Sequence, residues 1–145
     1  MNTISRKSRF TFVVFTLAVC VLALSVGPAI AAGVKVTLSG DQEVPPVKTS
    51  ASGSGTITVG ADKSVSGSIT TSGIKGTAAH IHLGAPGHGG LPILTLQKTS
   101  DNVWSVPAGA KFTGAQYDDY KTGYLYINVH SEAHKEGEIR GQLNP

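Results

Sequence analysis

Two neighbouring histidines have the spacing of a metal-ligand pair on a strand. His80 and His82 are separated by one residue in the segment 78–82, Ala-Ala-His-Ile-His. Successive side chains of a β-strand point to opposite faces, so the two imidazoles share one face and Ile81 takes the other. The spacing therefore brings two ring nitrogens within reach of one ion.

A third histidine ends a later apolar segment. His130 closes the run 124–130, in which Leu125, Ile127 and Val129 alternate with other residues, so we expect it on the polar face of its strand. If the two strands are near neighbours, the three imidazoles converge. Neutral imidazole suits copper and zinc, and a site without thiolates tolerates an oxidising compartment. The alternative is structural, with the histidines hydrogen-bonded to neighbouring strands and bracing the fold.

The two remaining histidines are weaker candidates. His88 lies in the Gly- and Pro-rich loop 84–90 and could close over an ion held by the other histidines. His134 follows His130 by four residues and shares its face only if the connection makes a helical turn. Because loops lie on the surface, we expect both side chains to be exposed to solvent.

Three charged residues are candidates for structural or partner contacts. Glu138 and Arg140 alternate with Ile139 and share a strand face, and Glu43 precedes a Val-Pro-Pro turn. The planar fork of an arginine can hold a substrate anion, but it equally holds a loop carbonyl or carboxylate. We favour the structural interpretation for all three.

Catalytic patterns are sparse in this sequence. No serine stands in a Gly-x-Ser-x-Gly turn, and the sole cysteine, Cys20, lies in an apolar leader. Asp118 and Asp119 are adjacent and would diverge on a helix rather than act as a pair. These features favour a protein that binds without catalysing a reaction.

The rest of the chain predicts an all-β fold. Short alternating segments separated by Gly, Ser, Asp and Pro are typical of an antiparallel Greek-key or immunoglobulin-like β-sandwich, here of about seven or eight strands. The exception is 114–121, where Thr113 and Gln116 form a capping box and Gly123 stands at the expected end of a short helix.

Four segments carry a family resemblance. They are Val-Thr-Leu-Ser-Gly at 36–40 with Glu-Val-Pro-Pro at 43–46, His-Ile-His-Leu-Gly-Ala-Pro at 80–86, Asn-Val-His at 128–130, and Gly-Glu-Ile-Arg-Gly-Gln-Leu at 137–143. In this order and spacing the chain resembles a CHRD domain, the chordin-type module also found in small secreted microbial proteins. The resemblance implies an extracellular protein- or surface-interaction module.

A looser comparison concerns the metal. Copper-zinc superoxide dismutase is also a β-sandwich with a His-x-His pair on a strand, but this chain has no matching disulfide cysteines and no recognisable zinc loop. Redox chemistry of that kind is the most distant of the functions considered.

The first 31 residues read as an export signal. Arg6, Lys7 and Arg9 precede an apolar run over 10–26, and Ala-Ile-Ala at 29–31 fits a cleavage site. We therefore expect a signal peptide over 1–31, retained as an anchor if uncleaved, and one domain over 32–145, secreted or periplasmic and free of the membrane.

The charge of the chain belongs to this leader. Of 12 Lys/Arg, three lie in it, which leaves nine against nine Asp/Glu. No basic stripe remains for nucleic acid. The sequence thus predicts a secreted protein that binds copper or zinc through His80, His82 and His130, or alternatively an interaction module in which these histidines are structural.

Overall fold

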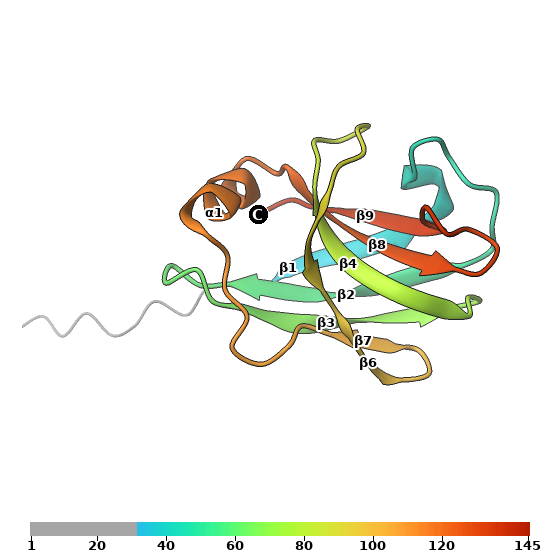
Figure 1. Cartoon of the computed structure of the whole chain (residues 1–145), viewed down its shortest axis with the longest axis horizontal. Helices are drawn as coiled ribbons and strands as arrows, with labels where there is room; N and C mark the ends of the chain where they lie inside the picture. The colour runs from blue at the N-terminus through green and yellow to red at the C-terminus, as the bar shows by residue number, and fades with distance from the viewer. Residues whose placement is uncertain (1–31) are drawn as a thin grey trace, which may run out of the picture.

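The computed structural model describes residues 32–145, which form one antiparallel β-sheet and one short α-helix (Figure 1). The predicted signal peptide, 1–31, lies outside the described residues. The strands are β1 (Val34–Ser39), β2 (Ser52–Val59), β3 (Val65–Ser72), β4 (Gly76–Leu83), β5 (Pro92–Thr95), β6 (Gln97–Ser100), β7 (Val103–Ser105), β8 (Leu125–Ser131) and β9 (Ile139–Leu143). A 3-10 turn, η1 (Gly40–Gln42), follows β1, and the helix is α1 (Gly114–Lys121).

The sheet curls into a nearly closed barrel. Its strand order is β5-β4-β8-β9-β1-β2-β3-β7-β6. The two strands at its ends are consecutive in the chain, with only Leu96 between them, and the Leu96 amide donates to the Ala79 carbonyl of β4 at 2.9 Å. One chain segment therefore pairs with β4 through its first half and with β7 through its second half. Closure of this kind removes the exposed edges of an open sheet.

Alternation along each strand separates a dry interior from a polar exterior. On β8, Leu125, Ile127 and Val129 are fully buried, and on β4 the same holds for Ala79 and Ile81. These apolar side chains fill the barrel together with residues such as Leu38, Ile57 and Trp104 of the other strands. The intervening residues of β4 and β8, histidines among them, consequently lie on the outer face of the sheet.

The short helix has the predicted bounds. Thr113 Oγ1 accepts a hydrogen bond from the Gln116 amide, and the Gln116 side chain accepts one from the Thr113 amide, which completes the capping box. Gly123, at φ +73°, ends the segment in a backbone conformation that favours glycine. Helix α1 lies at one end of the barrel, near the C-terminus (Figure 1).

The all-β antiparallel architecture with one short helix is confirmed for the part of the chain that the structure describes, where the strands number nine and belong to one continuous sheet. Strands β2 and β3 form a hairpin around 60–63 and pair in full from Ser52 to Val59. Within residues 32–145, no helix is long and apolar enough to cross a membrane.

Candidate metal centre

Pairing of β4 with β8 brings the three predicted histidines together. In the antiparallel register, His80 lies opposite Asn128 and His82 opposite Tyr126, while His130 lies opposite Ala78. Ile81 and Ile127, between them, point into the core. All three imidazoles therefore stand on the outer face of the same two strands, as the sequence predicts for neighbouring strands.

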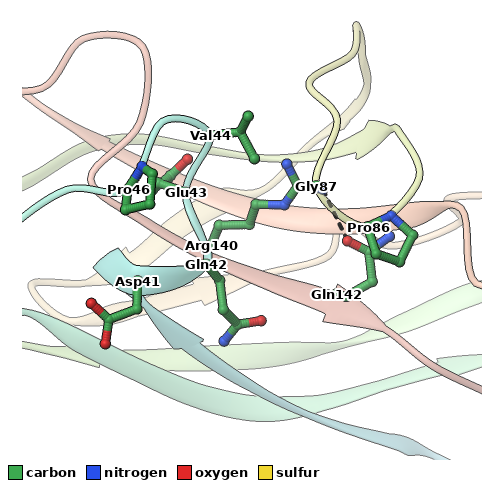
Figure 2. A pocket seen from close by; sticks show the side chains of 9 residues that line it. All are labelled: Asp41, Gln42, Glu43, Val44, Pro46, Pro86, Gly87, Arg140 and Gln142. Atoms are coloured by element: carbon green, nitrogen blue, oxygen red, sulfur yellow. Dashed lines mark hydrogen bonds between the residues drawn. The ribbon is translucent and has the colours of Figure 1, made fainter.

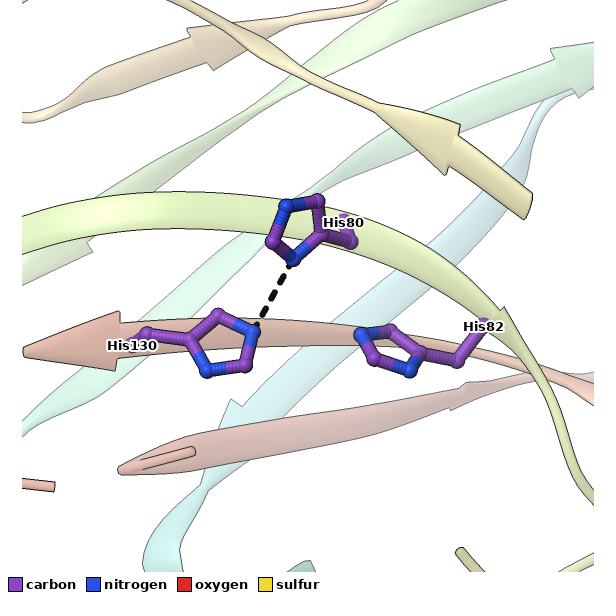
Figure 3. Close-up of side chains that lie close together, drawn as sticks. All are labelled: His80, His82 and His130. Carbon is purple, nitrogen blue, oxygen red and sulfur yellow. Dashed lines mark hydrogen bonds between the residues drawn. The ribbon is translucent and has the colours of Figure 1, made fainter. Parts of the chain in front are cut away.

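The three rings converge on a common point (Figure 3). His80 Nδ1 and His130 Nε2 are 3.0 Å apart, and one ring nitrogen from each of the three histidines lies within 4.8 Å of the others. Zinc–nitrogen bonds are about 2.0–2.1 Å long, which sets nitrogens of a tetrahedral site about 3.3 Å apart. The His80–His130 pair is close to that spacing, and the third nitrogen, from His82, lies within 4.8 Å of both.

The protonation of His82 leaves one nitrogen free. Its Nδ1 lies 2.9 Å from the carbonyl oxygen of Gly90. A carbonyl only accepts, so Nδ1 carries the proton and donates, and in the neutral ring Nε2 then holds a bare lone pair. This Nε2 atom is buried and has no hydrogen-bond partner in the protein. A buried acceptor without a donor is unusual, and a cation would satisfy it.

His130 has the same arrangement. Its Nδ1 lies 2.8 Å from the Lys135 carbonyl oxygen, so it donates there and Nε2 is free to accept. In the neutral cluster His80 Nδ1–H is then the donor to His130 Nε2. Metal-binding histidines commonly donate their second ring N–H to a backbone carbonyl, which orients the ring. Two of the three histidines, His82 and His130, show this feature.

The electrostatic environment favours neutral imidazoles. Burial, and then the neighbouring His130 and His82 rings, hold the pKa of His80 below its usual 6.5. The pKa of His82 is also lowered, mainly by burial, against a smaller opposing effect of its bond to Gly90. Only neutral imidazole binds metal, so His80 and His82 are available as ligands near neutral pH. His80 and His130 remain partly exposed, which leaves the outer side of the cluster open to solvent.

The two weaker candidates lie apart from this cluster. His88 is exposed and its Nδ1 lies 3.2 Å from the Pro86 carbonyl oxygen. His134 forms a tight turn, in which its amide and carbonyl both bond to Ser131. Among residues 32–145, the group of potential metal ligands contains His80, His82 and His130 and neither of these two.

Arg140 is a structural anchor on the neighbouring strand β9. Its side chain donates to the carbonyls of His88 and Ala85 and to the Gln142 amide oxygen, at 2.9, 3.1 and 3.0 Å. Its guanidinium carbon lies 3.6 Å from the centre of the Tyr126 ring. The residue is only 2% exposed, so these contacts replace its hydration.

The two acidic candidates also make internal contacts. Glu43 accepts a hydrogen bond from the Asn128 amide at 2.6 Å, and Glu138 accepts one from the Thr49 hydroxyl at 2.7 Å. Burial raises the pKa of Glu43 to about 7 despite the opposing charge of Arg140. Glu43 and Arg140 line a hollow of about 380 Å³ beside Val44 (Figure 2).

Sequence reasoning missed the residues that orient the histidines. Tyr126 stacks on His82, with ring centres 4.9 Å apart and planes 17° apart. Tyr126 lies two residues before Asn128 and four before His130, so alternation along the strand could have placed it on the same polar face. The carbonyls of Gly90 and Lys135 give no such signal, because every residue has one.

Fold and site together define a small antiparallel β-barrel with a histidine cluster on its outer wall. The family model described as CHRD domain matches residues 34–143, and the chain belongs to this family. No curated protein and no solved structure matches the chain.

Proposed function

We propose that this protein is an extracellular, non-enzymatic binding module that holds one divalent copper or zinc ion. Its ligands are His80, His82 Nε2 and His130 Nε2. The observation that carries the proposal is the buried, unpartnered lone pair of His82 Nε2, directed into a cluster of imidazoles. Membership of the CHRD family supports a binding module, and the signal-like leader supports export from the cell.

The donor set supports this choice of metal. Imidazole nitrogen suits copper and zinc, whereas magnesium and calcium prefer oxygen. The residues 32–145 contain no cysteine or methionine, so soft sulfur ligands are absent from this domain. When bound, the ion would draw the three rings together and join β4 to β8 through their side chains.

A metal titration with paired variants tests the proposal. Protein without an affinity tag should bind copper or zinc at about 1:1, and His82→Ala should weaken binding at least about 100-fold because it removes a ligand. His88→Ala is the matched control, since it removes an exposed imidazole outside the cluster, and its affinity should equal that of the wild type. Calorimetry gives both values. Equal loss in the two variants, or no binding by the wild type, would contradict the proposal.

A second candidate function is a protein- or surface-interaction module in which the histidines only brace β4 against β8. The exposed apolar side chains near the loop after β4 favour it: Leu91 is 78% exposed and Tyr124 48%. Under this alternative, His82→Ala lowers stability and no metal binds to either protein. Thermal unfolding of both proteins, with and without added zinc, separates the two functions.

A further inference from the structure

The loop over 84–91 supplies the group that decides which nitrogen of His82 is free. Its Gly90 carbonyl accepts the Nδ1 proton of His82 at 2.9 Å. The position of a neutral histidine's proton follows the hydrogen bond that the ring makes. Displacement of Gly90 would therefore let the proton move to Nε2, and the lone pair would then face away from the cluster.

Arg140 fastens this loop to the sheet. One terminal nitrogen of its guanidinium donates to the His88 carbonyl and the other donates to the Ala85 carbonyl. The two bonds leave the planar fork from different nitrogens, which a lysine cannot reproduce with its single ammonium. Few other residues could hold two carbonyls of one loop at once.

A second route links Arg140 to the same histidine. The guanidinium lies over the Tyr126 ring, and this ring stacks on His82. The Tyr126 hydroxyl also accepts a hydrogen bond from the Gly90 amide at 3.1 Å. Tyr126 thus contacts both the ring of His82 and the residue that accepts its proton.

We propose that Arg140 is a positioning residue of the histidine cluster, which keeps the Nε2 lone pair of His82 directed at the ion by holding the loop over 84–91. The consequence for metal affinity rests on the proposed function. The tautomer of His82 is a property of the metal-free protein, and it can be measured whether or not a metal binds.

The experiment compares Arg140→Lys and Arg140→Gln with the wild type. Nitrogen NMR of the metal-free proteins should show His82 with Nδ1 protonated and Nε2 bare in the wild type. Both variants should show a mixture of tautomers, and their zinc affinity should fall about tenfold, as for other groups that orient metal ligands. Lys98→Gln is the matched control. Like Arg140, Lys98 has its cation over an aromatic ring, that of Trp104, and donates to a backbone carbonyl, that of Gly76. Both contacts lie away from the loop.

The outcomes separate the two proposals. An unchanged His82 tautomer in both Arg140 variants overturns the positioning role, even if metal binds. A changed tautomer in a protein that binds no metal supports the positioning role and contradicts the proposed function. Normal behaviour of Arg140→Lys beside a defective Arg140→Gln would show that charge alone matters, and would also overturn the role of the fork.

A milder variant serves if both Arg140 variants fail to fold. Tyr126→Phe keeps the stacked ring and removes the hydroxyl that bonds the Gly90 amide. It should shift the His82 tautomer in the same direction by a smaller amount. A wild-type tautomer in this variant would contradict the link through Gly90.

Discussion

At the scale of single residues, backbone carbonyls determine how the histidine side chains are protonated. The Gly90 and Lys135 oxygens each accept an Nδ1 proton, from His82 and His130 respectively. Each bond orients its ring, and in the neutral form of the ring the proton stays on Nδ1 and Nε2 carries the lone pair. The fold thus selects the binding nitrogen of two of the three histidines, whereas His80 Nδ1 donates to His130 Nε2 and must give up that proton before it can bind an ion.

The lowered pKa values predict how metal binding responds to acid. Because the pKa of His80 and that of His82 lie below 6.5, these rings stay neutral to lower pH than ordinary histidines. Zinc affinity should change little between about pH 7.5 and 6.5, and fall below that range as protons compete for the nitrogens. Calorimetric zinc titrations at several pH values between about 7.5 and 5.5 measure this affinity. A loss of about tenfold already by pH 6.5 would contradict the account.

Glu43 predicts a separate effect of pH on stability. The pKa of this carboxyl is raised by burial from 4.5 to about 7, so the folded protein keeps a proton that the unfolded chain releases. The stability due to this proton is fully present below about pH 4.5 and is lost as pH rises through about 7. Glu43→Gln keeps an acceptor oxygen for Asn128 and carries no charge.

Glu43→Gln should therefore have a higher melting temperature than the wild type at about pH 8.5. At about pH 5 the increase should be smaller or absent. The other ionisable side chains are the same in both proteins, so the difference between the two melting curves isolates Glu43. An equal difference at both pH values would show that the Glu43 carboxyl does not titrate in this range.

At the scale of elements, the connection between β8 and β9 holds both His130 and the Glu43–Asn128 pair. Gly137 has φ +134°, and a Cβ built on it would overlap the Asn128 amide and approach the Glu43 carboxylate. The same connection supplies the Lys135 carbonyl to His130. Close packing at one glycine thus fixes a loop that orients a candidate ligand.

Gly137→Ala should consequently lower both stability and metal affinity. We expect a loss of roughly 2–4 kcal/mol in the free energy of unfolding, since strain adds to overlap. Gly109→Ala is the matched control: its φ is +77° and nothing lies within 4 Å of the added Cβ, so it should lose only about 1–2 kcal/mol. Urea unfolding measures both. A smaller loss in Gly137→Ala than in Gly109→Ala would contradict this packing argument.

The elements themselves were predictable because they follow local rules. Alternation around His80 and His82 and over 124–130 predicted β4 and β8 and their buried faces, and the capping box at Thr113 predicted the start of α1. Strand order and register were not predictable, since they depend on contacts between distant segments. The bend at Leu96, which closes the barrel, has no local signature.

At the scale of the whole molecule, the candidate site stands on the outer face of a packed part of the barrel wall. Strands β4, β8 and β9 are consecutive neighbours in the sheet, and the inward side chains beside the cluster, such as Ile81, Ile127 and Ile139, are fully buried. Alternation along the strands identified the three histidines as candidates. They come together only because β4 pairs with β8, and the sequence alone could not predict that pairing. The carbonyls that select their tautomers come from loops, whose paths follow from the complete fold.

The most direct test of the central claim is a crystal structure of the zinc- or copper-loaded protein, with anomalous scattering measured at the absorption edge of the metal. We expect one strong anomalous peak about 2.0–2.1 Å from a ring nitrogen of His80 and from Nε2 of both His82 and His130. An ion bound elsewhere, or the three imidazoles still bonded only to one another and to backbone carbonyls at saturating metal, would contradict it.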